Sequence, residues 1–264
     1  MWTPDRFETV KPTFDGVLYR ENGGRGIPPK VDIYLPPGPG PHPSVILVHG
    51  GAYLVGSRNM KPMRFLASEL VKAGFVVASM DYRMVLRGGR FTEGVDDVEA
   101  MMDWWVGQTK AYELDPKNIS ILGVSAGSAL TLMALERRPH QDIARIVSVY
   151  GVYDFVNLGG GLLRLLRRAL FRSNDPALWN QYSPLTSFKG PQPILFLHGT
   201  NDGIVPIEQA YALHKRRLNE DYPTRLEVSE GSPHGFFNDA SSSAARTNIT
   251  HLMEFLHADL ERGA

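Results

Sequence analysis

The sequence predicts an α/β protein built on an open, mostly parallel β-sheet with helices on both faces. Several short runs rich in Val and Ile are almost continuously apolar, as expected of strands buried on both faces of a parallel sheet. Stretches with helical periodicity separate these runs, and this alternation is typical of βαβ units. A length of 264 residues, 43% of them hydrophobic, is enough for one large domain with a buried core.

The first part of the chain departs from this alternation. Residues 14–43 contain two short pieces of alternating polarity, a Gly-rich turn between them and a proline cluster at the end. Because proline cannot occupy a central strand, we expect a hairpin at about residues 13–36, at one edge of the sheet.

The remaining elements follow in regular order. Apolar runs predict strands at 44–50, 75–82, 118–125, 143–151 and 193–199, and a shorter strand is expected at 224–230. Helical periodicity predicts helices at 59–73, 95–109, 125–138, 206–219 and 244–261. No change in composition marks a domain boundary, so we expect a single domain over residues 1–264.

One segment, at about residues 155–190, interrupts the alternation. Its Leu-rich helix, expected at 162–171, carries apolar residues on one face and three arginines on the other. Amphipathic helices of this kind commonly pack on a sheet. The alternative is a small helical lid over the mouth of an active site.

Charge and composition exclude several classes of function. The formal net charge is zero, so the sequence predicts no nucleic-acid partner and no electrostatic attraction to a membrane. The chain has no cysteine, which excludes disulfides and thiolate metal sites. No run is long and apolar enough to span a bilayer, and the N-terminus lacks the apolar region of a leader peptide. We therefore expect a cytoplasmic protein, although a secreted protein whose leader has been removed is compatible with the sequence.

The stretch ILGVSAGSAL at 121–130 places Ser125 between Gly123 and Gly127, where an expected strand ends and an expected helix begins. A nucleophile at such a sharp turn has a strained backbone and needs very small residues two positions before and after it. The N-terminus of the helix also offers N–H groups where an oxyanion would form. We predict that Ser125 is a nucleophile; the alternative is a helix-capping serine between two turn glycines.

A serine hydroxyl needs a general base, which in turn needs an orienting carboxylate. In sheets of this type the chain order is Ser, acid, His. His234, in a loop between Pro233 and Gly235, is the predicted base. The other histidines after Ser125 lie in expected helices, at a helix end or at a strand end: His140, His198, His214, His251 and His257.

Two aspartates compete for the role of the acid. Asp202 in HGTNDGIVP comes directly after the strand at 193–199, on a loop at the expected edge of the sheet. Asp154 follows the preceding strand, but it opens the segment 155–190 and is expected to cap or tether it. We favour Asp202.

The stretch HGGAYLVGS predicts an oxyanion hole after the strand at 44–50, because glycines let a backbone approach an acyl group closely. This loop contains Gly50, Gly51 and Ala52, and the expected donors are the N–H groups of Gly51, Ala52 and Ala126. Large apolar residues are candidates for the walls of a substrate pocket, although plain packing also explains them: Tyr53, Leu54, Leu163, Phe171, Trp179 and Phe236.

Five motifs occur in order over residues 30–260: HGGAYLVGS, DYR at 81–83, GVSAG, HGTNDGIVP and SPHGF. Together they resemble serine esterases of the α/β-hydrolase superfamily, similar to bacterial esterases of the hormone-sensitive-lipase type and to smaller feruloyl and acetyl esterases. The resemblance implies an eight-stranded, mostly parallel sheet and a triad of Ser125, Asp202 and His234.

The sequence departs from that family pattern at two places. Ala52 stands where the oxyanion motif often has a third glycine, and an alanine can replace it unless that backbone needs a positive φ. MVLRGGRFTEGVDDV follows DYR in place of the usual Leu-Ala-Pro-Glu, which favours the smaller esterases. With little chain before the oxyanion strand, the segment 155–190 is expected to roof the pocket, and the resemblance suggests short, soluble esters.

The sequence therefore predicts a serine carboxylesterase that hydrolyses a small-molecule, short-chain ester through an acyl-enzyme, without a metal or organic cofactor. Three related activities stay open: an acetyl or feruloyl esterase on polysaccharide, an aryl formamidase (kynurenine formamidase-like), and a small peptidase. A non-enzymatic ligand-binding module on a hydrolase scaffold is the alternative from another class. A homodimer is also left open.

Overall fold

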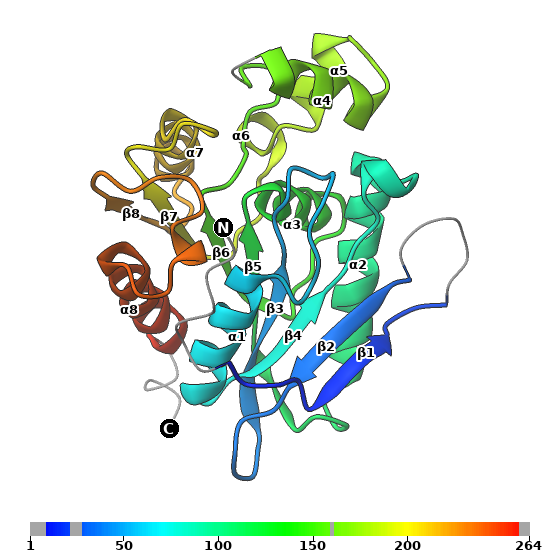
Figure 1. Cartoon of the computed structure of the whole chain (residues 1–264), viewed down its shortest axis with the longest axis vertical. Coiled ribbons are helices and arrows are strands. Elements are labelled where there is room, and N and C mark those ends of the chain that lie inside the picture. Colours follow the sequence, from blue (N-terminus) through cyan, green and yellow to red (C-terminus); the bar gives the residue numbers. More distant parts are fainter. Residues whose placement is uncertain (1–8, 22–27, 159–160, 259–264) are drawn as a thin grey trace.

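An eight-stranded sheet runs through the centre of the computed structural model, which describes residues 9–21, 28–158 and 161–258, without the side chains of 161–164 (Figure 1). The strand order is β1-β2-β4-β3-β5-β6-β7-β8, and every pairing from β4 to β8 is parallel. The strands are β1 (Phe14–Leu18), β2 (Lys30–Tyr34), β3 (His42–Val48), β4 (Val76–Met80), β5 (Leu114–Val124), β6 (Ile143–Val149), β7 (Ile194–Gly199) and β8 (Thr224–Ser229). The predicted fold class is confirmed.

The edge formed by β1 and β2 is antiparallel. β1 pairs with β2, and β2 pairs in turn with β4 with Val31 opposite Met80. The prolines that follow β2 lie outside the strand, as the inability of proline to donate to a ladder requires.

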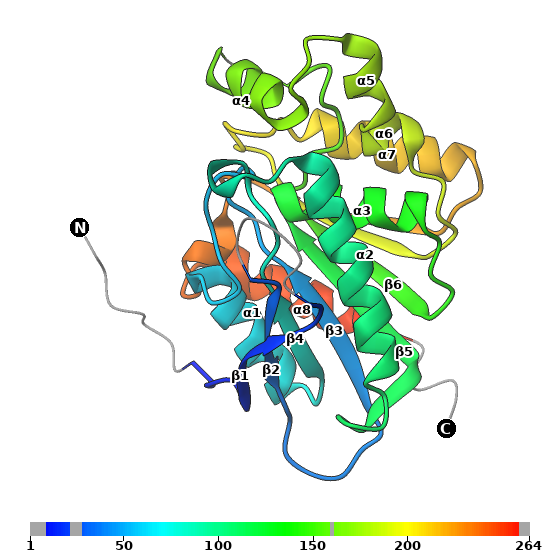
Figure 2. The same ribbon diagram turned by 90° about the vertical axis from the view of Figure 1, so that its right-hand side faces the viewer.

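Five helices cover the two faces of the sheet (Figures 1 and 2). They are α1 (Lys61–Lys72), α2 (Phe91–Gly107), α3 (Ala126–Arg137), α7 (Glu208–Asn219) and α8 (Ser243–His257). The helices α2, α3 and α7 pack on one face, and α1 and α8 pack on the other. Along β3, Ile46 and Val48 point to the first face, and Val45 and Leu47 point to the second. Burial on both faces explains why the strand sequence is continuously apolar.

The helix α2 begins at Phe91, four residues before the expected start at 95. The reason is tertiary, because the Phe91 ring packs edge-on against Phe155 and Tyr182 from the segment 155–190. A partner so distant in sequence leaves no trace in the local periodicity.

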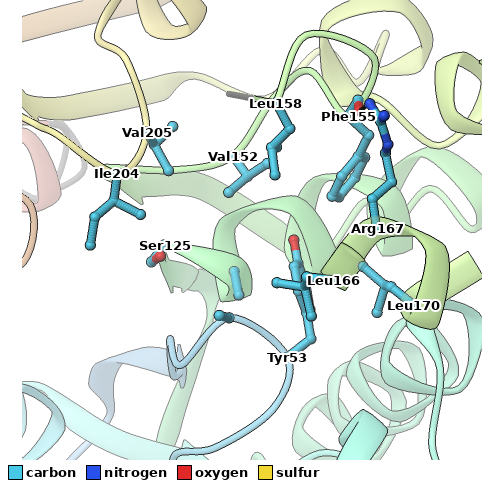
Figure 3. Close-up of a pocket in the computed structure, with 12 residues that line it drawn as sticks. Tyr53, Ser125, Val152, Phe155, Leu158, Leu166, Arg167, Leu170, Ile204 and Val205 are labelled. Carbon is cyan, nitrogen blue, oxygen red and sulfur yellow. Dashed lines mark hydrogen bonds between the residues drawn. The ribbon is translucent and has the colours of Figure 1, made fainter. Parts of the chain in front are cut away.

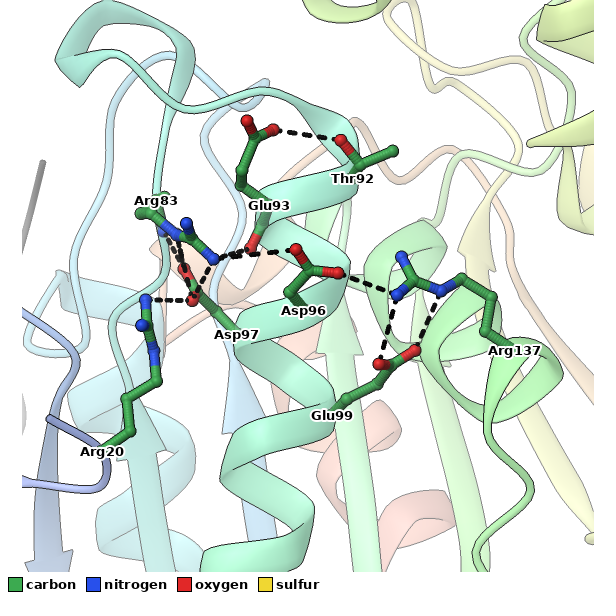
Figure 4. Close-up of polar contacts among 8 residues, drawn as sticks. All are labelled: Arg20, Arg83, Thr92, Glu93, Asp96, Asp97, Glu99 and Arg137. Carbon is green, nitrogen blue, oxygen red and sulfur yellow. Dashed lines mark hydrogen bonds and ion pairs between the residues drawn. The ribbon is translucent and has the colours of Figure 1, made fainter. Parts of the chain in front are cut away.

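A polar network ties the edge of the sheet to the helices (Figure 4). Asp97 of α2 is buried and accepts hydrogen bonds from the Arg20 guanidinium at 2.6 Å and from the Arg83 N–H at 2.7 Å. On the outer side of α2, Asp96 and Glu99 pair with Arg137 of α3. Arg83 of the DYR motif therefore has a structural role between the end of β4 and α2.

The segment 155–190 forms a roof beyond the C-terminal ends of the central strands (Figure 1). It contains α4 (Gly161–Phe171), α5 (Pro176–Gln181) and α6 (Pro184–Ser187). Short 3₁₀ helices occur at Val85–Arg87 and Phe236–Asn238. Within the described ranges, no helix has both the length and the apolar character needed to cross a membrane.

Candidate active site

Ser125 lies on a tight turn between β5 and α3, with φ of 52° and ψ of −115°. A Cβ atom at Gly123 would lie 2.6 Å from the Ser128 Cα, and one at Gly127 would lie 2.3 Å from the Val48 carbonyl oxygen. Both distances are far below van der Waals contact, so only glycine fits at these two positions. The strained serine between two obligatory glycines is the geometry that the pattern predicts.

Ser125, His234 and Asp202 form one hydrogen-bonded line. The Ser125 Oγ lies 3.0 Å from the His234 Nε2, and the His234 Nδ1 lies 2.7 Å from the Asp202 Oδ2. A carboxylate acceptor at Nδ1 favours the tautomer with its proton there, which leaves Nε2 free to accept the serine proton. The structure thus brings together three residues from three loops that are up to 109 positions apart.

Asp202 is held as a carboxylate by four donors. Its Oδ1 accepts the N–H groups of Ile204 and Val205 at 2.9 and 2.8 Å, and its Oδ2 contacts the imidazoles of His234 and His198. Burial alone would raise the pKa of Asp202, but the hydrogen bonds from His198, His234 and Val205 outweigh it and hold the pKa well below its usual value. Asp202 therefore stays ionised at neutral pH.

His198 is a site residue that the sequence analysis leaves at the end of a strand without a role. Its buried Nε2 lies 3.1 Å from the Asp202 Oδ2 and 3.0 Å from the Val205 carbonyl oxygen. The spacing of four residues across the strand end in HGTND is the one sequence signal for this contact. His198 and His234 thus contact the same carboxylate oxygen of Asp202, and His198 can help to fix its orientation.

Asp154, the competing acid, is engaged elsewhere. Its Oδ1 accepts the N–H groups of Val156 and Asn157 at 2.8 and 3.1 Å, and its Oδ2 accepts the Asn157 side-chain amide at 2.7 Å. Asp154 therefore closes a local turn at the start of the roof.

We refer to residues 49–58, the loop after β3, as the oxyanion loop. Gly51, Ala52 and Tyr53 have φ values of 119°, 54° and 62°. A Cβ at Gly51 would lie 1.8 Å from the Val55 carbonyl oxygen, so this position requires glycine. Ala52 adopts the positive φ that a glycine would adopt freely, at a cost of about 1 kcal/mol.

Free N–H groups surround Ser125. In the described part of the chain, the N–H groups of Gly51, Ala52 and Ala126 donate to no protein acceptor. Gly50 lies directly against the nucleophile, since a Cβ there would be 3.2 Å from the Ser125 Cβ. The arrangement can bind an oxyanion that develops beside Ser125.

Polar contacts from the end of β4 hold the oxyanion loop. Arg58 donates to Asp81 and to Asp32 at 2.6 Å each, and both carboxylates are buried. The Tyr82 ring stacks on His49 with a centroid distance of 4.2 Å, and its hydroxyl donates to the His49 carbonyl oxygen. These contacts give Asp81 and Tyr82 of the DYR motif a role that the sequence did not reveal.

Two cavities meet at Ser125. The narrow cavity has a volume of about 40 Å³ and lies under the roof (Figure 3), and its walls are Ala52, Tyr53, Ser125, Ala126, Val152, Phe155, Leu158, Leu166, Arg167, Leu170, Ile204 and Val205. The wide cavity has a volume of about 390 Å³ and opens on the side of His234. Its walls are Gly50, Gly51, Ala52, Leu54, Val55, Met60, Pro62, Leu86, Val124, Ser125, Tyr150, Ile204, His234, Gly235 and Asn238.

The structure corrects three of the predicted pocket walls. Tyr53 lines the narrow cavity and Leu54 lines the wide one, but Phe171, Trp179 and Phe236 line neither. Phe171 packs behind the cavity against Phe155 and Tyr182, Trp179 lies under the Arg167 guanidinium, and Phe236 packs on Tyr150. Leu163 lies among the side chains outside the described part. Large aromatic rings fill the space between elements, so smaller aliphatic residues form most of the walls.

The chain is similar to known esterases. The family model described as BD-FAE matches residues 31–217. Esterase LipC of Mycobacterium tuberculosis is 27% identical over 218 residues, which are 74% of this chain and 53% of that protein. The probable isoprenylcysteine alpha-carbonyl methylesterase ICMEL2 of Arabidopsis thaliana is 24% identical over 258 residues, 87% of this chain and 60% of that protein. The chain thus spans little more than half the length of these curated relatives.

Solved structures confirm the α/β-hydrolase fold. An acetyl ester-xyloside bifunctional hydrolase from Caldicellulosiruptor lactoaceticus superposes with a TM-score of 0.81 at 18% identity, over 94% of this chain and 97% of that one. Thermogutta terrifontis esterase 2, phosphonylated by sarin, superposes with a TM-score of 0.80 at 19% identity, over 97% of this chain and 98% of that one.

Proposed function

We propose that this chain, which belongs to the BD-FAE family, is a serine carboxylesterase with Ser125, His234 and Asp202 as its triad. One observation carries the proposal: a line of hydrogen bonds at 3.0 and 2.7 Å runs from Ser125, which has free N–H groups near it, to the buried and ionised carboxylate of Asp202. Fold alone would not support an activity, whereas this set of groups has the geometry that acyl transfer needs. The named esterases among its relatives add support.

The reaction proceeds in two stages. The Ser125 Oγ attacks the ester carbonyl carbon while the His234 Nε2 takes the hydroxyl proton, and the N–H groups of Ala52 and Ala126, with that of Gly51, bind the oxyanion. The carbon–oxygen bond to the alcohol then breaks, and His234 gives its proton to the leaving alcohol. Water attacks the acyl-enzyme by the same steps, which releases the acid and restores Ser125. Asp202 remains ionised and stabilises the imidazolium throughout.

The positions of the two cavities support an assignment of the alcohol half of the ester to one cavity and of the acyl half to the other. His234 must reach the leaving oxygen, and it lines the wide cavity but not the narrow one. The alcohol therefore occupies the wide cavity, and the acyl group occupies the narrow one. Because one water molecule needs about 10–15 Å³, a cavity of about 40 Å³ has room for only about three groups of that size. The acyl group is accordingly short.

The residues that line the two cavities favour some of the related ester and amide hydrolase activities over others. Leu54, Val55, Leu86 and Ile204 give it a mainly apolar surface, which suits an apolar alcohol better than a sugar. A feruloyl group is too large for the narrow cavity. Hydrolysis of an aryl formamide is the second candidate, because a formyl group fits the narrow cavity and an aryl group fits the wide one.

A panel of p-nitrophenyl esters from acetate to palmitate, with N-formylkynurenine and a feruloyl ester beside it, tests the proposal. We expect kcat/KM to be highest for the short acyl esters, and Ser125→Ala to lower it by about 10³-fold or more. Asp202→Asn should impair kcat far more than the matched Asp154→Asn. Activity that persists in Ser125→Ala, or a preference for palmitate, would contradict the proposal.

A further inference from the structure

Tyr53 carries a buried hydroxyl without a partner. Tyr53 is only 5% exposed, and in the described part of the chain its hydroxyl oxygen has no hydrogen-bond partner. Tyr53 lines the narrow cavity, and Figure 3 shows its hydroxyl end directed toward the region between Val152 and Phe155. A buried hydroxyl that lacks a hydrogen bond costs about 1–3 kcal/mol.

Among the residues that the structure describes, the rest of the narrow cavity offers this hydroxyl no protein partner. Its walls are mostly apolar side chains, among them Val152, Leu158 and Leu170. Arg167 also lines the cavity, but its Nη1 donates to the carbonyl oxygens of Phe155 and Val156 at 2.6 and 2.7 Å. The Tyr53 hydroxyl therefore offers a ligand a neutral polar group away from the reacting centre, whereas the Arg167 guanidinium binds backbone carbonyl oxygens and stacks on Trp179.

The backbone and the ring hold the hydroxyl in this position. Tyr53 has a φ of 62°, a conformation that is strained for an aromatic residue, and its carbonyl oxygen accepts the Val85 N–H at 2.8 Å. The ring packs against both Phe91 and Phe155, at centroid distances of 5.8 and 6.2 Å. Because burial raises the pKa of Tyr53 well above its usual value, the phenol keeps its proton and can donate.

We propose that Tyr53 determines acyl specificity, with its hydroxyl binding a neutral polar group on the acyl half of the substrate. The preferred acyl group is then short and carries a hydroxyl or an oxo group. A plain alkyl chain leaves the phenol unpaired in the complex, and an anionic group would compete with the carbonyl oxygens of Phe155 and Val156 for the Arg167 guanidinium. This inference rests on the proposed esterase function and on the assignment of the acyl group to the narrow cavity.

The experiment compares esters of one alcohol that differ only in acyl polarity. The p-nitrophenyl esters of butyrate, 3-hydroxybutyrate and acetoacetate, and of propionate and lactate, are assayed with wild type, Tyr53→Phe and the exposed control Tyr211→Phe. The readout is the ratio of kcat/KM for each polar ester to that for its alkyl counterpart. Differences in intrinsic reactivity cancel when this ratio is compared between enzymes.

For at least one polar ester, we expect the ratio in wild type to exceed that in Tyr53→Phe by about 10-fold, the value of one hydrogen bond of about 1.4 kcal/mol. Tyr211→Phe should keep the wild-type ratio. Equal ratios in wild type and Tyr53→Phe would overturn the role of Tyr53 and mean that its hydroxyl binds water. The proposed triad would still stand in that case if Ser125→Ala is inactive.

Two further results keep the proposal testable. If Tyr53→Phe fails to fold, the wild-type ratios decide, after division by the hydroxide-catalysed rates of the same esters. A wild-type preference for the alkyl esters would then overturn the inference. Absence of activity on every ester would instead overturn the proposed esterase function.

Discussion

The oxyanion loop and the roof both line the narrow cavity, yet different forces hold them. The oxyanion loop is held by directional polar contacts: Arg58 donates to two buried carboxylates, and the Tyr82 hydroxyl donates to the His49 carbonyl oxygen. The loop also contains positions where a side chain has no room, as at Gly51.

The roof has a large share of aromatic packing beside its hydrogen bonds, such as those from Arg167 to the Phe155 and Val156 carbonyl oxygens. Phe155, Phe171 and Tyr182 form a cluster with Phe91 of α2, with centroid distances of 5.0 to 5.6 Å. Arg167 adds its stacking on Trp179 at 3.6 Å. Apolar contacts of this kind are non-directional, so they stabilise the roof without setting any one atom to within a fraction of an ångström.

The difference follows from what each region must do. Oxyanion donors work only when they lie at hydrogen-bond distance from the developing charge, and a displacement of 1 Å can cost about 100-fold in rate. The walls of an acyl cavity need only the right volume and polarity. We therefore expect changes in the oxyanion loop to reduce kcat, and changes in the roof to alter stability and substrate preference.

Among changes in these two regions, the largest effect is expected for Gly51→Ala. The new Cβ would lie 1.8 Å from the Val55 carbonyl oxygen, so the loop must move and its N–H groups with it. We expect kcat on p-nitrophenyl acetate to fall by about 100-fold. Gly74→Ala is the matched control, because Gly74 also has a positive φ of 89° but has nothing within 4 Å of its Cβ position. A wild-type kcat in Gly51→Ala would show that the loop can accept the new Cβ without displacing its N–H groups.

Removal of the Arg58 guanidinium should have a smaller but clear effect. Arg58→Met leaves Asp81 and Asp32 buried without their partner, and we expect a loss of about 2–3 kcal/mol in the free energy of unfolding in urea. We also expect kcat to fall by about 10-fold. The exposed pair between Lys72 and Glu69 provides the control, since Lys72→Met should cost less than about 1 kcal/mol. Equal losses in the two variants would mean that the ion pairs of Arg58 stabilise the fold no more than an exposed ion pair does.

Acid should lower the stability of the folded protein through protonation of Asp202. Its pKa in the folded protein lies below the usual value near 4, so its ionised form stabilises the fold above about pH 4, and this contribution is lost as the pH falls below that. Asp202→Asn lacks the carboxylate. Relative to the variant, wild type should therefore lose on the order of 2 kcal/mol between pH 6 and pH 2, as measured by urea unfolding. A difference that stays constant over this range would refute the role of the hydrogen bonds to Asp202.

The smallest effect is expected in the roof. Phe171→Leu should lower the free energy of unfolding by about 1 kcal/mol, because a smaller side chain fills the aromatic cluster less well. The looser roof should raise kcat/KM for butyrate relative to acetate by about 2- to 5-fold. Leu165→Ala on the same helix is the control, since Leu165 is 67% exposed and should change neither quantity. A fall in kcat on acetate as large as that of Gly51→Ala would remove the distinction between the two regions.

The structure also shows where sequence reasoning reaches its limit. The alternation of apolar runs and helical periods predicted the sheet, and the starts and ends of helices shifted where a distant partner intervened, as at Phe91. Arg58 carried no local signal for its contact with Asp81, and the contact of His198 with Asp202 was indicated only by their spacing of four residues. Arg58 and Asp81 lie close in space because the neighbouring parallel strands β3 and β4 end at the same edge of the sheet.

By itself, the sequence determined the parallel sheet, the turn at Ser125 and the chain order of Ser125, Asp202 and His234. These features depend on local chemistry: apolar runs buried on both faces, and glycines where a Cβ would strike the backbone. Only the tertiary structure decided that Tyr53 lines the narrow cavity and that Phe171, Trp179 and Phe236 do not. The shape of a cavity depends on how elements far apart in the chain pack together, and local sequence does not encode that packing.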